Sequence, residues 1–283
     1  MSENTVIPEA IVARPGNRIR ASGPILILAT LFVAATFLAW YFTWFGRGLS
    51  DAEITKYLSD TGNPRHVQHA LLQIQQRIER GDLSAKNWYP QITALSGSSE
   101  PEFRLTTAWL MGFDNHSNEF HSALAKLVTD TEPIVRRNAS LALVRFNDAG
   151  GHDELVAILK PYSVKSPATG VVSSTLRQGS DVSRGTLLAR VQQVDGQILE
   201  VRSPLPGKIE AISKANSSQV DTAEEILRLN SDEESVWEAL RGLSFIGTNA
   251  DLENVRAFTS SSTVTERVRE QAKLTASAIE LKR

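Results

Sequence analysis

The sequence predicts a mainly α-helical protein with an N-terminal transmembrane helix, helical repeats, and a small all-β module that interrupts the repeats. Three observations predict this architecture: an uncharged apolar run near the start of the chain, a helical motif that recurs, and a central segment whose halves resemble each other. We expect a tail at 1–22, a span at 23–46, a first block of repeats at 47–162, the module at 163–230 and a second block of repeats at 231–283.

The composition excludes several classes of protein. The 283 residues include 30 Lys and Arg against 32 Asp and Glu, and this net charge of −2 provides no broad basic surface for nucleic acid. The chain has no cysteine, which excludes disulfides, cysteine nucleophiles, Cys-ligated zinc and iron–sulfur clusters. We therefore expect no nucleic-acid partner.

A helix that spans the bilayer is predicted near the N-terminus. No charged residue occurs between Arg20 and Arg47, and residues 24–45 would extend about 33 Å as a helix, which matches the hydrocarbon core of a bilayer. The run ends in the aromatic residues that favour the headgroup region: Trp40, Tyr41, Trp44 and Phe45. Because the run is longer than the apolar region of a signal peptide, we expect an uncleaved anchor that contacts lipid.

The basic residues that flank the span predict its orientation. Three precede it and two follow it closely: Arg14, Arg18 and Arg20 on one side, Arg47 and Lys56 on the other. The positive-inside rule then places the N-terminus in the cytoplasm. We expect residues 1–22 to be a disordered tail, since they contain few apolar residues. The protein would cross a bacterial inner membrane once, with the bulk of the chain in the periplasm.

A helical motif recurs after the span. In its clearest copy, residues 130–159, Pro133 begins a helix with an apolar face, and a short turn leads to a second apolar helix. A second copy covers 100–127, and its Pro101 precedes Pro133 by the length of one helical hairpin. Weaker copies begin at residues 63, 235 and 264, and the last of them contains Val-Arg-x-x-Ala.

This motif resembles the HEAT repeat, an antiparallel helix pair whose first helix has a D-x-x-P-x-V-R-x-x-A-type pattern. One such pair cannot bury its apolar face alone, so neighbouring pairs stack into a continuous core. The resemblance implies a HEAT-like α-solenoid with repeats 1–3 before the module and repeats 4 and 5 after it. An irregular helical bundle is the alternative.

The central segment repeats on itself. Residues 164–172 match 201–209 at an offset of 37, and residues 181–191 match 219–229 at an offset of 38. Each half predicts strands separated by turns, with Gly170 and its counterpart Gly207 expected at turn positions of positive φ. Since neither half can bury enough apolar surface alone, we expect two interleaved halves that form a small sandwich.

The duplication resembles the biotinyl/lipoyl barrel-sandwich hybrid, whose halves carry S-P-x-x-G-x-V and G-x-x-V-x-x-G-x-x-L patterns. In carrier members of that family, a lysine at the tip of the hairpin between the halves receives biotin or lipoate. Here the tip is predicted as Asp195-Gly196 in a type I′ turn, and Gly196 occupies the lysine position. No lysine occurs between Lys165 and Lys208, so we expect no cofactor.

Similar unmodified modules occur in periplasmic adaptor (membrane-fusion) proteins, which also have an N-terminal anchor. In those proteins a long coiled-coil hairpin usually separates the halves, whereas here the connection is short. No Gly/Ser- or Pro-rich tether borders the module, so we expect it to be held between repeats 3 and 4.

No catalytic signature is found: G-x-S-x-G, G-x-G-x-x-G, the P-loop and H-E-x-x-H are all absent from the sequence. His66 and His69 could share a helix face, which leaves a His-based metal site as an alternative. We expect Trp109 to fill the core, and we expect Trp88 and Tyr89, beside a proline in a loop-like stretch, to contact a partner protein.

The expected function is that of a non-enzymatic, membrane-anchored, extracytoplasmic scaffold or assembly subunit. It would bind other proteins of an inner-membrane complex, because stacked repeats present extended binding surfaces. Two alternatives remain: an adaptor-like component of a transport or efflux system, and an accessory subunit of an enzyme with a His-based metal site.

Overall fold

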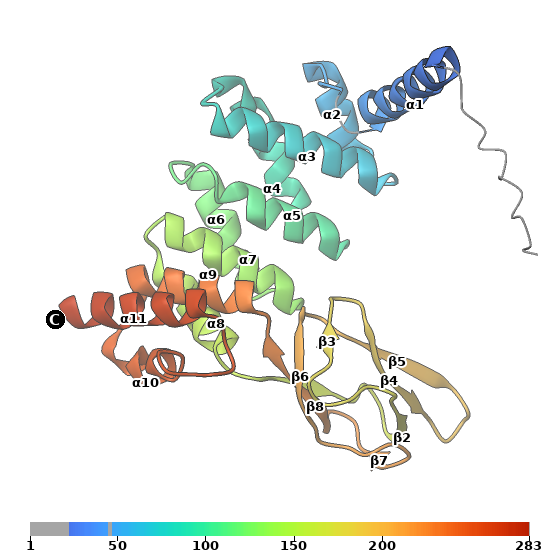
Figure 1. Cartoon of the computed structure of the whole chain (residues 1–283). Helices are drawn as coiled ribbons and strands as arrows, with labels where there is room; N and C mark the ends of the chain where they lie inside the picture. The colour runs from blue at the N-terminus through green and yellow to red at the C-terminus, as the bar shows by residue number, and fades with distance from the viewer. Residues whose placement is uncertain (1–22, 45–46, 283) are drawn as a thin grey trace, which may run out of the picture. The chain divides into compact units, whose positions relative to one another are not determined.

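A computed structural model describes residues 23–44 and 47–282 of the protein (Figure 1). The predicted tail, residues 1–22, and the last two residues of the predicted span lie outside the described residues. The chain divides into two units, residues 1–48 and 49–283, which are described separately. The described residues form eleven α-helices and eight β-strands.

The first unit contains one apolar helix, α1 (Gly23–Trp44). Its large side chains are well exposed, for example 70% for Leu28 and 72% for Phe32. The hydroxyls of Thr30 and Thr36 donate hydrogen bonds to carbonyl oxygens four residues earlier, so neither needs water as a partner. The helix is long and apolar enough to cross a membrane.

The second unit is built mainly from helices. Those before the module are α2 (Asp51–Ser59), α3 (Pro64–Glu79), α4 (Tyr89–Leu95), α5 (Pro101–Met111), α6 (Asn118–Leu127), α7 (Pro133–Arg145) and α8 (His152–Ile158). Those after it are α9 (Glu233–Ile246), α10 (Leu252–Arg256) and α11 (Glu266–Leu281). Helices α3, α5 and α7 begin with proline, whose missing N–H would have no intrahelical partner there.

The first helices of the five predicted copies are neighbours in the structure. Helix α3 contacts α5, α5 contacts α7, α7 contacts α9, and α9 contacts α11. An arginine in α5, α7 and α11 donates to carbonyl oxygens of the segment before its own helix: Arg104 to Ser98 and Ser99, Arg136 to Asp130 and Thr131, Arg269 to Ser261 and Val264. The three helices therefore share one kind of contact at their start.

Two apolar clusters stabilise the helices. One is formed by side chains of α2 to α7, and the other by side chains of α8, α9, α10 and α11. The second cluster joins helices on both sides of the β module. A Cβ added to Gly242 of α9 would lie 2.8 Å from Cδ1 of Leu155 in α8, so these two helices approach closely. The module therefore interrupts the sequence of the helical core but not its packing.

The module consists of two four-stranded antiparallel sheets. Its strands are β1 (Tyr162–Lys165), β2 (Gly170–Ser173), β3 (Asp181–Val182), β4 (Leu187–Gln192), β5 (Ile198–Arg202), β6 (Gly207–Ile212), β7 (Gln219–Val220) and β8 (Glu225–Ser231). The sheet orders are β1-β8-β6-β3 and β5-β4-β2-β7. Each sheet contains two strands from each half. When each strand of the first half is exchanged for its equivalent in the second half, β1 for β5 through β4 for β8, one sheet order becomes the other. The expected interleaving of the halves is therefore confirmed.

Two equivalent glycines allow the strands to approach. A Cβ on Gly170 would lie 2.4 Å from the carbonyl oxygen of Gln192, and one on Gly207 would lie 2.1 Å from that of Asn230. Neither glycine has a positive φ, so the expectation of left-handed turn positions was wrong. Both glycines instead begin a strand, where the neighbouring backbone leaves no room for a side chain.

We expect Gly207→Ala to lower the free energy of unfolding by about 1–3 kcal/mol, because the new methyl group must displace a paired strand. Thermal unfolding of the full chain in detergent, followed by circular dichroism, measures this change. Gly62→Ala is the matched control, since a Cβ there meets nothing within 4 Å. Equal unfolding temperatures for the two variants would contradict the close approach of β6 to β8.

Candidate binding groove at the junction of the module and the helices

The hairpin between the two halves joins β4 to β5. The Gly196 N–H donates to the Gln193 carbonyl at 3.0 Å, and the Gln193 N–H donates to the Gln197 carbonyl at 2.8 Å. Gly196 has a φ of +84°, whereas Asp195 has no positive φ. The turn is therefore type I, with Val194 and Asp195 at its centre and glycine following in the left-handed region.

This geometry corrects the predicted type I′ turn at the tip. A type I′ turn requires a positive φ at both of its central residues. Of Asp195 and Gly196, only Gly196 has a positive φ. The side chain at the tip is Val194, which is fully exposed. A side chain at Gly196 would be strained by its backbone conformation, so this position is not suited to a lysine.

The two ends of the module lie side by side. Strand β1 pairs with β8 in antiparallel fashion, with Tyr162 opposite Leu229. After β8, Asp232 caps α9 by accepting a hydrogen bond from the Ser235 N–H at 3.0 Å. Helix α8 ends four residues before β1 begins, and α9 begins two residues after β8 ends. Both connections to the helices are therefore short.

A buried arginine links the helices to the module at this junction. Arg137 of α7 is 4% exposed, and its Nη2 donates to Oγ of Ser231, the last residue of β8, at 3.2 Å. Its Nε lies 3.7 Å from a carboxylate oxygen of Glu154, which also accepts a hydrogen bond from Arg136 at 2.9 Å. Burial lowers the pKa of Arg137, while the carboxylates of Glu154 and Asp232 oppose this shift.

A second polar contact joins the module to an earlier helix. Arg184, in the turn that follows β3, forms an ion pair with Glu102 in the first turn of α5. These two residues are 82 positions apart in the sequence. The module thus contacts α5 and α7 as well as being bonded to α8 and α9 through the chain.

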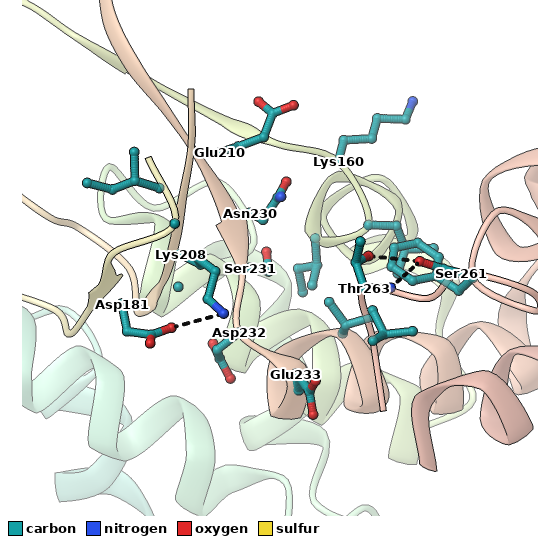
Figure 2. A pocket seen from close by; sticks show the side chains of 18 of the residues that line it. Lys160, Asp181, Lys208, Glu210, Asn230, Ser231, Asp232, Glu233, Ser261 and Thr263 are labelled. Carbon is teal, nitrogen blue, oxygen red and sulfur yellow. Dashed lines mark hydrogen bonds and ion pairs between the residues drawn. The ribbon is translucent and has the colours of Figure 1, made fainter. Parts of the chain in front are cut away.

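A groove of about 810 Å³ lies where the module meets the C-terminal helices (Figure 2). Its apolar lining comes from the end of α8, from α9, from the segment between α10 and α11, and from β6: Ile158, Leu159, Val236, Ala257, Phe258, Val264 and Ile209. Its charged lining comes from the module, its two connections and the first residue of α9: Lys160, Asp181, Lys208, Glu210, Asp232 and Glu233. A groove of this size is within the range of ligand sites in proteins.

The groove has an excess of negative charge. Four carboxylates and two ammonium groups line it. In Figure 2 the Lys208 side chain points to Asp181, and the Nζ–Oδ1 distance is 3.6 Å. Sequence reasoning missed this groove because its walls come from distant segments, and Lys208 gave no signal beyond its place after a predicted turn.

The structure corrects the predicted protein interface at Trp88 and Tyr89. These side chains are only 3% and 6% exposed. The Trp88 Nε1–H donates to Thr55 at 2.9 Å, and the Tyr89 hydroxyl donates to Asp114 at 2.8 Å. The stretch is not a loop, since Trp88 ends a 3₁₀ turn and Tyr89 begins α4. Trp109, expected in the core, is instead 42% exposed.

Three of the five histidines form separate pairs with aspartates, whereas His69 contacts Gln73. The closest nitrogen–oxygen distances are 2.7 Å for His66–Asp60, 2.6 Å for His121–Asp148 and 2.8 Å for His152–Asp251. Within residues 23–44 and 47–282, no three His, Cys, Asp or Glu side chains are grouped so that they could hold a metal ion. The described part of the chain therefore gives no support to the His-based alternative.

Comparisons with known proteins give little guidance. No family model and no curated protein match the chain. Among solved structures, an engineered protein studied by a structural genomics consortium is similar to it, with a TM-score of 0.42 and 16% identity. That similarity covers 81% of this chain and 78% of the other, and at this TM-score it supports no conclusion about fold or function.

We expect Ser231→Ala to lower the free energy of unfolding by about 1.5–3 kcal/mol, because it removes a hydrogen bond to the buried Arg137 guanidinium. Thermal unfolding of the full chain in detergent measures the change. Ser262→Ala, at an exposed position, is the control. An effect of Ser231→Ala no larger than that of the control would show that Ser231 does not hold the module in place.

The His152–Asp251 pair predicts a pH dependence of stability. Burial opposes protonation of His152, but hydrogen bonds to Asp251 and Asp153 outweigh it and raise the histidine pKa above 6.5. The contribution of His152 to the free energy of unfolding is therefore complete below pH 6.5. It is lost as the pH rises through the raised pKa of this histidine. Burial also opposes ionisation of Asp251, but hydrogen bonds from His152 and Thr248 lower its pKa below 3.8, so its contribution is lost only in acid.

We expect His152→Asn to lower the unfolding temperature most near about pH 5.5, where the histidine is charged, and less near about pH 9. Unfolding temperatures of wild type and variant across this range provide the measurement. His116→Asn is the control, because the His116 side chain is 89% exposed. A difference between wild type and His152→Asn that stays constant with pH would contradict a charged pair.

Proposed function

We propose that the protein is a membrane-anchored, extracytoplasmic scaffold or assembly subunit that binds other proteins of an inner-membrane complex. In this proposal α1 is the single-pass anchor, with a cytoplasmic N-terminus and the second unit in the periplasm. The exposed apolar surface of α1 supports the anchor, and the arginines before it support this orientation.

The proposal treats the helices as a HEAT-like solenoid and the module as an unmodified biotinyl/lipoyl-like barrel-sandwich hybrid. The neighbouring first helices and their shared arginine contacts support the first assignment. The exchange of equivalent strands between the two sheets supports the second, because that family has a quasi-twofold duplication.

The observation that carries the proposal is the fixed attachment of the module. Short connections, the Arg137–Ser231 hydrogen bond and the Arg184–Glu102 ion pair all join it to the helices. A carrier module must move its modified lysine between sites. This module instead has a valine at its tip, and its other end is attached to the helices. A fixed module adds a shaped surface to the helices, which suits protein binding.

The groove at the junction is the proposed contact site. Its apolar residues favour apolar side chains of a partner, and its excess of carboxylates favours lysine or arginine beside them. We therefore expect the partner to insert a segment that is both apolar and basic. Such a segment would bury apolar area and complement the charge in the same contact.

Purification with a C-terminal tag in mild detergent tests this function. We expect wild type to retain a partner of the membrane complex at near-stoichiometric level. The double variant Asp181→Lys/Glu233→Lys should retain at least about tenfold less of this partner, because the new lysines repel its basic residues. Glu79→Lys/Glu119→Lys reverses two exposed charges outside the groove and should retain the partner. Quantitative mass spectrometry of the eluates measures the ratio.

The outcomes separate the candidate functions. Equal retention by both double variants would contradict the groove as the contact site. Recovery of a transporter together with an outer-membrane channel would contradict the scaffold and support the adaptor alternative. Absence of any stoichiometric membrane partner from the wild-type eluate would contradict the scaffold itself.

A further inference from the structure

Strand β5 ends its sheet and leaves one side of its backbone without a partner strand among the described residues. The Gln193 N–H donates to the Gln197 carbonyl, and the Ser203 N–H donates to the Thr186 carbonyl. Hydrogen-bonded residues alternate along an antiparallel ladder, so residues 199 and 201 also face β4. Ile198, Glu200 and Arg202 therefore direct their N–H and C=O groups away from the sheet.

The other ends of the two sheets are poorer templates for strand addition. Strands β3 and β7 have two residues each, and β1 has four residues and follows α8 through a short connection. Strand β5 has five residues and contains no proline. Short length and prolines are two of the features that protect sheet edges, and β5 has neither of them. The irregularity of the β4–β5 pair, between Leu187 and Ala189, places the extra residue in β4. Figure 1 shows β5 at the border of its sheet.

The exposed side chains of β5 are complementary to a second copy of themselves. Ile198, Glu200 and Arg202 are exposed, whereas Leu199 and Val201 face the core of the module. When two β5 strands run antiparallel with Glu200 opposite Arg202, two-fold symmetry produces the same ion pair twice. Glu200 and Arg202 are also residues with outward backbone groups, so the opposed residues form hydrogen-bonded pairs.

The charges select this register over its neighbour. Moving one strand by two residues would place Glu200 opposite Glu200, and like charges directly opposite each other are destabilising. Moving it by one residue would turn Leu199 and Val201 of the second copy to the solvent face. Within one chain Glu200 already contacts Arg202 at 2.6 Å and Arg190 at 3.4 Å, so the carboxylate is ionised and lies between two guanidinium groups.

We propose that two copies of this chain associate through their β5 strands, antiparallel and with Glu200 opposite Arg202 in both directions. The two four-stranded sheets β5-β4-β2-β7 then form one continuous eight-stranded sheet. The exposed Ile198, at 57%, and Val194, at the hairpin tip, lie beside this contact. Because strand addition buries a small area, the dimer forms in a concentration-dependent way.

Charge exchange tests the pairing. Glu200→Arg places arginine at both positions, and Arg202→Glu places glutamate at both, so each variant repels its own copies. We expect wild type to form dimers in sedimentation velocity of the full chain in detergent, and each single variant to need at least about tenfold higher concentration. An equimolar mixture of the two variants, and the double variant Glu200→Arg/Arg202→Glu, should both recover dimerisation.

The mixture keeps the test independent of folding and of the apolar helix. Each variant that fails alone must associate with the other, which a misfolded chain would not do. Every sample contains α1, so association through that helix would be the same in all samples. A wild type that is monomeric at every concentration, single variants that dimerise like wild type, or a mixture that fails to recover would each overturn the β5 pairing.

Disulfide trapping checks the register. The chain has no cysteine, so Glu200→Cys and Arg202→Cys each introduce its sole thiol. On mild oxidation, the mixture should form a cross-linked dimer, because directly opposed Cβ atoms lie about 4.5–5.5 Å apart. Each variant alone should form at least about fivefold less, since its thiols are diagonal to each other at about 7–8 Å. Equal trapping in all three samples would overturn the proposed register.

Discussion

The antiparallel pairing of β1 with β8 is the constraint on which the second unit depends. It brings the start and the end of a seventy-residue module to adjacent strands, so the chain leaves α8 and returns to α9 at neighbouring points. Helices α8 and α9 can then pack as if they were consecutive, with Leu155 against Gly242. Without this pairing, the apolar cluster that joins the helices before and after the module could not close.

The junction also decides how the module behaves. A buried guanidinium is costly to desolvate, and Arg137 donates a hydrogen bond to Ser231 of the module and lies 3.7 Å from the Glu154 carboxylate, while its Nε and Nη1 have no hydrogen-bond partner among the described residues. Such an interaction is sensitive to geometry, which favours one orientation of the module over others. The groove follows from this orientation, because its lining combines α8 and α9 with the solvent face of β6.

The internal duplication produces two equivalent sheets whose surroundings differ. Strands β1 and β5 hold the same place in their respective sheet orders. Strand β1 follows α8 through a short connection, whereas β5 follows a hairpin turn, and the β1–β8 and β4–β5 pairs carry equivalent irregularities. Equivalent positions in a duplicated fold can thus acquire different roles, one in attachment and one in association.

The sequence by itself determined the features that depend on nearby residues: the apolar helix, the helix starts at prolines, the arginine of the Val-Arg pattern, and the strands of the duplicated segment. The tertiary structure alone decided the burial of Trp88 and Tyr89 and the groove. Burial depends on what packs against a side chain, and Thr55 and Asp114 are over twenty residues from their aromatic partners. The groove required segments separated by more than a hundred residues to meet, and no local pattern records such a meeting.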